Sequence, residues 1–309
     1  MKQNTITIGT RGSALAMYQA EEVRSKLMAQ YPELTVTIKI ISTRGDEILD
    51  IALSKIGDKG IFTQEIEAAL LEGTIDLAVH SLKDLPTDLT DAFAIGAVLE
   101  RAESRDALVS RAHKPLKELT SSHRIATSSL RRKAGLLHLN PKLQIVDIRG
   151  NVNTRLRKME DGYCDAMVMA AAGLQRLGLD HYITEILEPE QLLPAVSQGV
   201  IAIEIRHGDE MVRPLVEQIN HPQTWTSILA ERSFMRTLMG GCQVPVGCFT
   251  KVNAGEMHMT GFVASVDGLQ YLTETISGRS ESAVSLGIQL ADKLINRGGA
   301  TILAAIRHQ

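Results

Sequence analysis

The feature that most constrains the fold of this chain is a regular alternation of short apolar strands with helices between residues 5 and 177. Strands that alternate with helices in this way run parallel, and each helix crosses over between two strands. The sequence therefore predicts an α/β protein with a doubly wound sheet in each of two successive parts. The expected strands cover 5–9, 34–41, 75–79, 93–99, 124–127, 143–148 and 165–169, and the expected helices cover 13–30, 47–54, 63–71, 129–138, 151–160 and 171–177.

The two parts resemble one another. EGTIDLAVHSLKDL at 72–85 aligns with DGYCDAMVMAAAGL at 161–174, and each segment places a glycine, an aspartate and an apolar strand before a turn. Any two strand entries can share such a pattern, so the repeat is a hypothesis. It predicts two similar lobes, as in periplasmic binding proteins, that face one another across a cleft with ligands at the carboxyl ends of the strands.

The rest of the sequence returns to the first lobe and then changes character. An apolar strand follows Pro194, and we interpret it as a return through hinges near 100–105 and 194–200. After residue 222, helices at 224–238 and 281–296 flank strands at 246–252, 256–266 and 271–277, and an Asp-Gly turn favours an antiparallel meander. The expected domains are a first α/β lobe (1–100 and 200–218), a second α/β lobe (105–194) and a small α+β C-terminal domain with a three-stranded antiparallel sheet (222–309).

Composition sets outer limits. The chain has 309 residues, of which 44% are hydrophobic and 22% charged, so it can bury a sizeable core and is not intrinsically disordered. No apolar stretch is long enough to span a bilayer, and the sequence starts without an apolar signal region. Its three cysteines are widely spaced, which is typical of a reducing compartment. We therefore expect a cytoplasmic protein.

Positive charge is concentrated in one segment. Between Arg124 and Arg157 the chain carries eight basic residues and one acidic residue, a net charge of +7, while the whole chain carries −3 and the remainder therefore about −10. A mildly acidic protein that gathers cations at one place is usually built to hold an anion there.

The positions of these cations strengthen that interpretation. Arg131 and Arg132 fall in the first turn of an expected helix, where the positive end of the helix dipole disfavours cations. A bound carboxylate or phosphate would offset this, since the free N–H groups and two guanidinium groups would converge on it. Any one of these arginines alone could be a solvated surface residue. The same strand-to-helix junction recurs with Arg149, Arg155 and Arg157 and with Arg11 and Ser13, and the recurrence favours an anion site.

Two further places could carry chemistry. Ser81, Lys83 and Asp84 follow an apolar strand, where a carboxylate beside a cation can stabilise positive charge or move a proton, although an ordinary polar turn before a proline would look the same. Cys242 lies between glycines and a proline in the loop GGCQVPVG, where a thiol is accessible. Cys164 and Cys248 lie in apolar strand contexts that predict burial. The cysteines lack partners at zinc-finger spacing, so no metal is expected.

These motifs carry a resemblance that covers nearly the whole chain in order. The sequence resembles the porphobilinogen deaminase family, whose members are also called hydroxymethylbilane synthases. The segments that resemble it are TRGSALAMYQA (10–20), STRGD (42–46), GDKGIFTQEIE (57–67), AVHSLKDLP (78–86), ESRDA (103–107), ATSSLRR (126–132), RGNVNTRL (149–156), AAGLQRLGL (171–179), AVSQG (195–199) and GGCQVPVG (240–247).

The resemblance implies a transferase of tetrapyrrole (haem) biosynthesis. Family members use a covalent dipyrromethane cofactor held by a thioether from the loop cysteine, here Cys242. Porphobilinogen loses ammonia to give an azafulvene that the growing chain attacks. After four rounds, hydrolysis releases the linear tetrapyrrole hydroxymethylbilane. Every pyrrole carries an acetate and a propionate, which explains why an acidic protein would line its site with arginines.

The resemblance also implies roles for individual residues. Asp84 is the expected catalytic residue, because it would face the pyrrole N–H groups, stabilise developing positive charge and assist proton transfer. The expected cofactor-binding residues are Cys242, Ser81, Lys83, Asp84, Thr127, Ser128, Ser129, Arg131, Arg132 and Gly199. The expected substrate-binding residues are Arg11, Ser13, Arg149, Arg155, Arg176, Lys55, Lys59 and Gln198.

Two other classes of protein remain as alternatives. A two-lobed binding protein for a small polycarboxylate would share the lobes and the arginines, but it would normally be exported and would have no use for a loop cysteine. An RNA-binding protein would interleave aromatic side chains with its cations, whereas only 4% of residues are aromatic. The expected partner is porphobilinogen, with no nucleic acid and no membrane, and the expected state is a monomer.

Overall fold

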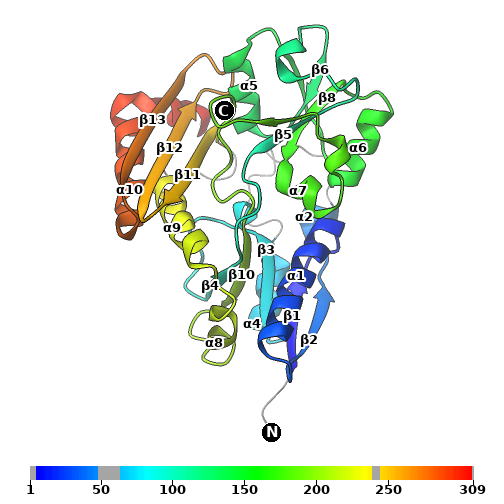
Figure 1. Cartoon of the computed structure of the whole chain (residues 1–309), viewed down its shortest axis with the longest axis vertical. Coiled ribbons are helices and arrows are strands. Elements are labelled where there is room, and N and C mark those ends of the chain that lie inside the picture. Colours follow the sequence, from blue (N-terminus) through cyan, green and yellow to red (C-terminus); the bar gives the residue numbers. More distant parts are fainter. Residues whose placement is uncertain (1–4, 48–62, 239–243, 308–309) are drawn as a thin grey trace. The chain divides into compact units, whose positions relative to one another are not determined.

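The computed structural model describes residues 5–47, 63–238 and 244–307 (Figure 1). The chain divides into two compact units. The first contains the described residues up to Ala102 together with Val200–Trp225, and the second contains Glu103–Gly199 and the described residues from Thr226 onward. None of the described helices is long and apolar enough to cross a membrane.

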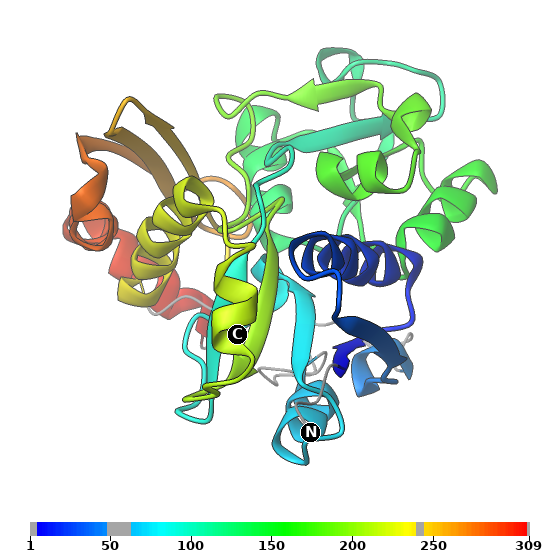
Figure 2. The ribbon, with the colours of Figure 1, turned by 60° about the horizontal axis from the view of Figure 1, so that its bottom comes forward.

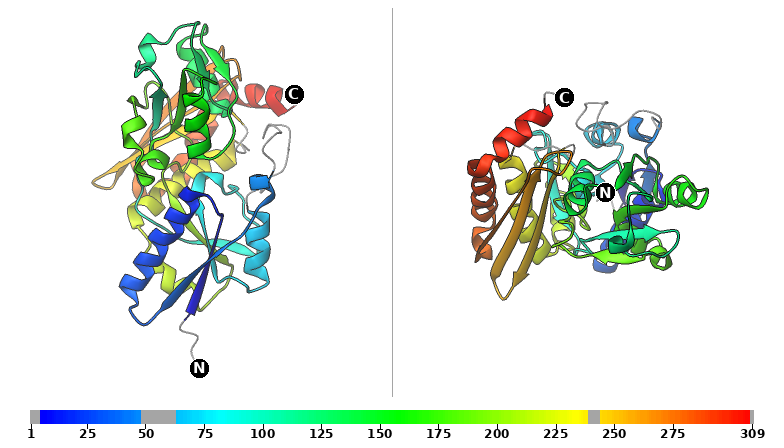
Figure 3. Two further views of the ribbon diagram at one scale, coloured as in Figure 1. Left: turned by 90° about the vertical axis from the view of Figure 1, so that its right-hand side faces the viewer. Right: turned by 90° about the horizontal axis from the view of Figure 1, so that it is seen from above.

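The first unit is built on a five-stranded sheet in the order β2-β1-β3-β10-β4. β1, β2 and β3 run parallel, whereas β10 pairs antiparallel with both β3 and β4. α1 and α4 cover opposite faces (Figure 3), because Leu77 and Val79 of β3 pack in the core under α1 while Ala78 packs under α4. The elements are β1 (Thr5–Thr10), α1 (Ala14–Gln30), β2 (Thr35–Ile40), α2 (Arg44–Glu47), α4 (Gln64–Leu71), β3 (Leu77–Ser81), β4 (Phe93–Val98), β10 (Ile201–Arg206) and α8 (Arg213–Glu217).

The second unit contains a sheet with the same pattern, in the order β7-β6-β8-β5-β9. β6, β7 and β8 run parallel, and β5 pairs antiparallel with β8 and β9. β8 thus takes the place that β3 has in the first sheet, which confirms the predicted repeat. The elements are β5 (Asp106–Ser110), β6 (Arg124–Ala126), α5 (Leu130–Leu139), β7 (Gln144–Val146), α6 (Val152–Glu160), β8 (Ala166–Ala170), α7 (Ala171–Arg176) and β9 (Glu185–Leu187).

A three-stranded antiparallel sheet, β11-β12-β13, with helices packed on it completes the second unit (Figure 2). The turn between β11 and β12 has positive φ angles at Ala254 (48°) and Gly255 (81°), as a two-residue hairpin turn with the right-handed twist of the strands requires. The elements are α9 (Pro222–Thr237), β11 (Val246–Asn253), β12 (Glu256–Ala264), β13 (Tyr271–Arg279), α10 (Ala283–Leu294) and α11 (Ala300–Arg307).

The predicted fold class is confirmed, and three details of the prediction are corrected. The two larger sheets are mixed, because periodicity reports which side chains are buried and carries no information on strand direction. The short strands β5 and β9 were not predicted. The final helix breaks at Gly298, whose φ is 105°, and continues as α11. Of the helix expected at 47–54 only residue 47 is described, as the end of α2, and residues 48–54 lie outside the described ranges.

Candidate functional site

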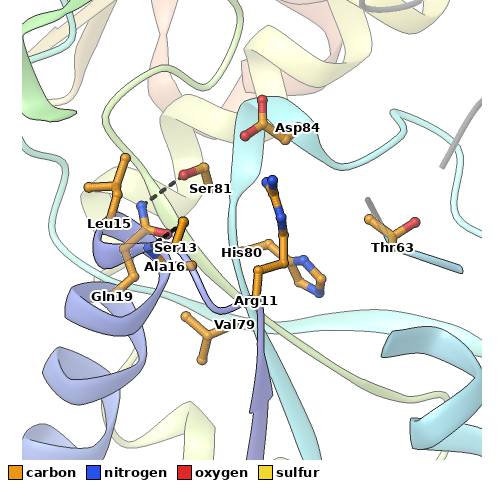
Figure 4. A pocket seen from close by; sticks show the side chains of 10 residues that line it. All are labelled: Arg11, Ser13, Leu15, Ala16, Gln19, Thr63, Val79, His80, Ser81 and Asp84. Carbon is orange, nitrogen blue, oxygen red and sulfur yellow. Dashed lines mark hydrogen bonds between the residues drawn. The ribbon is translucent and has the colours of Figure 1, made fainter. Parts of the chain in front are cut away.

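A small pocket of about 70 Å³ opens in the first unit where the parallel strands β1 and β3 end (Figure 4). Its position follows from the topology, since the carboxyl ends of neighbouring parallel strands meet at one edge of a sheet. It gathers four of the predicted site residues together with a histidine and a glutamine. The lining residues are Arg11, Ser13, Leu15, Ala16, Gln19, Thr63, Val79, His80, Ser81 and Asp84.

The ends of the elements hold these side chains in place. Ser13 is the N-cap of α1, and its hydroxyl accepts a hydrogen bond from the Ala16 N–H at 3.3 Å. The buried Gln19 donates its amide to the Ser81 hydroxyl at 2.8 Å. The Arg11 guanidinium extends from the end of β1 toward Asp84 (Figure 4). The pocket therefore places a cation, three hydroxyl side chains and a carboxylate around one space.

Asp84 is presented by the 3-10 helix η1 (Leu82–Asp84), which directly follows β3. Leu82 and Leu85 are buried, and the Leu82 N–H donates to the Val200 carbonyl at 3.0 Å. The backbone on both sides of Asp84 is thus anchored while its carboxylate stays exposed. Such a carboxylate can approach a ligand without first breaking a contact of the fold.

Two glutamates, Glu204 and Glu67, lie close to residues that line the pocket. His80 Nε2 lies 3.0 Å from Oε2 of Glu204, which is fully buried, and Oε1 of Glu204 has no hydrogen-bond partner among the residues that the structure describes. Burial raises the pKa of Glu67 on α4, although a hydrogen bond from Thr63 opposes the shift, and the nearby Glu204 raises it further. The charge of His80 opposes this shift, and negative charge on the two glutamates favours a positively charged group in the pocket.

The second unit contains a buried cluster of two arginines around one carboxylate. Asp106, the first residue of β5, is fully buried. Arg131 Nη1 lies 2.8 Å from its Oδ2, and Arg132 Nη2 lies 2.7 Å from its Oδ1. Gln198 donates its amide to the same Oδ1 at 2.9 Å. Three predicted site residues therefore meet at an aspartate that sequence analysis did not select.

The charges in this cluster do not balance. Burial opposes ionisation of Asp106, but the two guanidinium groups outweigh it and hold its pKa well below the usual range. One carboxylate facing two guanidinium groups leaves a net charge of +1 among buried side chains. Burial lowers the pKa of Arg131, and the charge of Asp106 opposes this shift. An anionic group brought to the cluster would stabilise it.

The residues before α5 serve the local structure. Ser129 is the N-cap of α5, and its hydroxyl accepts a hydrogen bond from the Arg132 N–H at 3.4 Å. Its own N–H donates to the Thr127 hydroxyl, and the Ser128 hydroxyl bridges to the backbone of Ile148. This confirms the predicted helix start. It also shows that Asp106 supplies part of the negative charge that the arginines in the first turn need.

Three further arginines of the predicted site lie in the same unit. Arg155 Nε donates to the Gly150 carbonyl at 2.7 Å, and Arg176 Nη2 donates to the Gly199 carbonyl at 2.9 Å. Arg149 Nη1 is buried and has no hydrogen-bond partner within the described ranges. A buried, unsatisfied guanidinium N–H is costly unless an acceptor binds to it, so Arg149 fits an anionic ligand.

The described cysteines are structural. Cys164 and Cys248 are both buried, as predicted, and burial raises the pKa of the Cys164 thiol to about 11. Neither is therefore a ready nucleophile. The predicted site residues Cys242, Lys55 and Lys59 lie outside the described residues. Among residues 5–47, 63–238 and 244–307, no group of three or more His, Cys, Asp or Glu side chains could hold a metal ion.

Sequence analysis missed the groups that hold the predicted residues. Asp106, His80 and Glu204 carry no motif signal of their own, and Glu204 lies 124 residues from its partner His80. A weak signal existed, because each of the three is a polar side chain next to or inside an apolar strand, and a buried ionisable group needs a partner.

The fold and the site together define an α/β protein in which two buried guanidinium groups share one carboxylate. A model of the family described as "Porphobilinogen deaminase, dipyromethane cofactor binding domain" matches residues 6–214, and one described as "Porphobilinogen deaminase, C-terminal domain" matches residues 225–296. The chain belongs to the porphobilinogen deaminase family.

Two relatives illustrate this membership. A porphobilinogen deaminase from Pelobacter propionicus is 44% identical over 306 residues, which cover 99% of this chain and 98% of that protein. One from Syntrophomonas wolfei is 47% identical over 302 residues, which cover 98% and 99%. Among solved structures, an ancestral cationic amino acid solute-binding protein is similar at 14% identity, with a TM-score of 0.44 over 71% of this chain and 89% of that chain.

The buried cluster leads to a prediction about stability. Asp106→Asn keeps the side-chain shape but leaves two buried guanidinium groups without an anion, so we expect the free energy of unfolding at pH 7 to fall by about 3–5 kcal/mol. Because the pKa of Asp106 is lower in the folded than in the unfolded protein, its contribution is present above about pH 4 and is lost as the pH falls.

Urea unfolding of both proteins between pH 7 and pH 3 measures this difference. The difference between wild type and variant should shrink on acidification. Asp292→Asn, on an exposed position of α10, serves as the control and should change stability by less than about 0.5 kcal/mol. Equal stability of wild type and Asp106→Asn at pH 7 would contradict the account of the cluster.

Proposed function

We propose that this chain catalyses the reaction of its family with the residues assigned here. Four porphobilinogen molecules condense head to tail, with loss of ammonia, to hydroxymethylbilane, on a dipyrromethane held by Cys242. The observation that supports this most is the excess charge of +1 at Arg131, Arg132 and Asp106, which lies in the matched cofactor-binding domain. A dipyrromethane with its acetate and propionate groups supplies the anions that this cluster requires.

The cofactor would be held at its carboxylates and at one carbon. Arg131 and Arg132 would bind the carboxylates of its rings. The thiol of Cys242 would add to the azafulvene left when a porphobilinogen unit loses ammonia, so that the sulfur bonds to the former aminomethyl carbon and the proton passes to the ring nitrogen. When bound, the dipyrromethane supplies the free pyrrole α-carbon to which the substrate units are added. Side chains and backbone at the strand ends complete the binding set: Ser81, Lys83, Asp84, Thr127, Ser128, Ser129 and Gly199.

Asp84 carries the catalytic role in this proposal. Its exposed carboxylate accepts hydrogen bonds from pyrrole N–H groups and stabilises positive charge that develops on the ring. Negative charge on the nearby Glu204 and Glu67 acts in the same direction. It can take a proton at the pyrrole and return it. Arg11, which extends toward Asp84, binds a substrate carboxylate and keeps it near the reacting carbon.

The remaining cations bind the carboxylates of the substrate units as the pyrrole chain is extended. Arg149, with its unsatisfied buried N–H group, is the best supported of them. The proposed substrate-binding set is Arg11, Ser13, Arg149, Arg155, Arg176, Lys55, Lys59 and Gln198. Each carboxylate gripped by a guanidinium contributes on the order of 1.5–3 kcal/mol.

We further propose three domains with the boundaries 1–100 and 200–218, 105–194 and 222–309. The polypeptide would act in the cytoplasm as a monomer and would bind no nucleic acid. Low aromatic content supports the last point, since single-stranded nucleic acids are held largely by stacking.

The thioether assignment is tested by intact mass. Cys242→Ser should give a folded protein without the added mass of two pyrrole units, because the two described cysteines, Cys164 and Cys248, are buried. Cys164→Ser and Cys248→Ser are the controls and should keep that mass. A normal adduct on the Cys242→Ser protein would refute the assignment, and an unmodified wild-type chain that binds polycarboxylates reversibly would point to a binding protein instead.

The role of Asp84 is tested by a substitution that removes the negative charge and keeps the shape of the side chain. Asp84→Asn should retain substrate binding, while the chemical step slows by roughly 10²-fold or more, a typical scale for loss of an acid–base or electrostatic group. Single-turnover kinetics with porphobilinogen measure the step directly. A near-normal rate would assign the role to another residue.

The arginines are expected to divide by function. Arg131→Leu or Arg132→Leu leaves one guanidinium for Asp106, so the cluster loses its excess charge and the protein should be recovered mainly without cofactor. Arg149→Leu or Arg155→Leu should yield protein with cofactor that stalls after one or more added pyrroles. Mass spectrometry separates these species. If all four variants carry the full cofactor and stall at the same step, the division is wrong.

A further inference from the structure

We propose that the aromatic stack of His138, Tyr271 and Phe262 positions Arg131 relative to β11, the strand that follows Cys242 in the chain. The inference rests on the proposed function of Arg131 as a ligand of the cofactor carboxylates. It concerns three side chains outside the pocket and the charged cluster, and it assigns them a part in cofactor acquisition.

The stack joins a helix to a sheet within the second unit. The Tyr271 ring lies between two others, with its centroid 4.2 Å from that of His138 at an interplanar angle of 7° and 4.5 Å from that of Phe262 at 13°. His138 belongs to the last turn of α5, and Arg131 belongs to the first turn of the same helix. Phe262 and Tyr271 belong to β12 and β13. Parallel rings at these distances fix the lateral position of the helix on the sheet.

The turn between β12 and β13 fixes the same helix end. Gly268 has a φ of +72°, and a Cβ there would lie 2.5 Å from the Ala134 carbonyl oxygen and 2.6 Å from the His138 backbone nitrogen. Its own carbonyl accepts a hydrogen bond from His138 Nδ1 at 3.3 Å, which requires a proton on that nitrogen. Only glycine allows so close an approach, so the hairpin and α5 move as one body.

Arg131 and the start of β11 are held by the same stretch of backbone. The Leu193 carbonyl accepts a hydrogen bond from Arg131 Nη1 at 2.6 Å, and the Pro194 carbonyl accepts one from the Cys248 N–H at 3.0 Å. A Cβ on Gly247 would lie 2.7 Å from the Pro194 carbonyl oxygen and 2.5 Å from the Phe262 ring. Contacts therefore run without a gap from the guanidinium group through this backbone and Phe262 to Tyr271.

The environment of Tyr271 suits this role. Its ring packs against the buried cluster of Ala134, Leu193, Phe262 and Ala264, so it contacts both the helix and the backbone stretch. Burial raises the pKa of its hydroxyl, so the side chain stays neutral beside Arg131 and does not compete with a ligand for the guanidinium charge. The positioning effect comes from the ring, and a phenylalanine should retain it.

Placement of this kind matters for a covalent attachment. The thioether forms only when the carboxylates gripped by Arg131 and the thiol that precedes β11 are in register, and a misplacement of about 1 Å can cost roughly 10²-fold in rate. The stack is the part of the framework built from side chains alone. It can therefore be removed without changing a charge in the cluster.

The experiment follows cofactor acquisition by full-length protein produced in cells that cannot make porphobilinogen. After porphobilinogen is added, intact mass spectrometry records the rate at which the mass of two pyrrole units appears. We expect Tyr271→Leu to acquire it about 10-fold more slowly than wild type or slower still, and Tyr271→Phe to acquire it within about twofold of the wild-type rate.

Two controls separate positioning from simple loss of stability. Gly287→Ala would force a Cβ into the Ala230 carbonyl and the Ser233 hydroxyl of α9, so it lowers the unfolding midpoint through the packing of α10 on α9 and replaces none of the three stacked rings. It should leave the acquisition rate unchanged well below that midpoint. Leu269→Ala changes an exposed residue of the turn between β12 and β13. It should change neither the unfolding midpoint nor the rate of cofactor acquisition.

The outcomes are distinct. If wild type never gains the two-ring mass, the proposed function fails. If wild type gains it and Tyr271→Leu does so at the same rate, the positioning role is wrong while the function stands. If Tyr271→Phe or Gly287→Ala acquires the cofactor as slowly as Tyr271→Leu, stacking is not the cause and the inference is overturned.

Discussion

The structure depends on a buried carboxylate that faces two guanidinium groups. Asp106 fixes Arg131 and Arg132 in the first helical turn, where the helix dipole disfavours cations, and Gln198 completes its hydrogen bonds. One carboxylate accompanies the two arginines in the interior of the protein. It neutralises only one of the two positive charges, and the remaining charge favours an anionic group beside the cluster.

The two units carry opposite electrostatics. In the second unit, one carboxylate between two guanidinium groups leaves excess positive charge. In the first, the exposed carboxylate of Asp84 and the nearby Glu204 and Glu67 are acidic. Under the proposed function, the positive environment binds the carboxylates of the substrate and the acidic environment stabilises positive charge that develops on its ring.

Sequence analysis predicted the elements and the exposed or cationic site residues well, and it missed their partners. Ser129 and Arg131 were predictable because an N-cap and a cation in the first turn are local signals. Asp106 was not, since its role arises only when β5 lies beside β8 and α5 packs over it. The antiparallel pairing of β10 with β3 and the contact of Glu204 with His80 both link segments more than 100 residues apart in the sequence. No local pattern predicts such contacts.

The central claim is that the cofactor completes an unbalanced buried charge. Thermal unfolding of the wild-type protein with and without its covalent cofactor, at one pH and ionic strength, tests it most directly. The account predicts a midpoint several degrees higher with the cofactor, since about 1.5–3 kcal/mol for each shielded guanidinium–carboxylate contact corresponds to such a shift in a protein of this size. Equal midpoints for the two forms would contradict it.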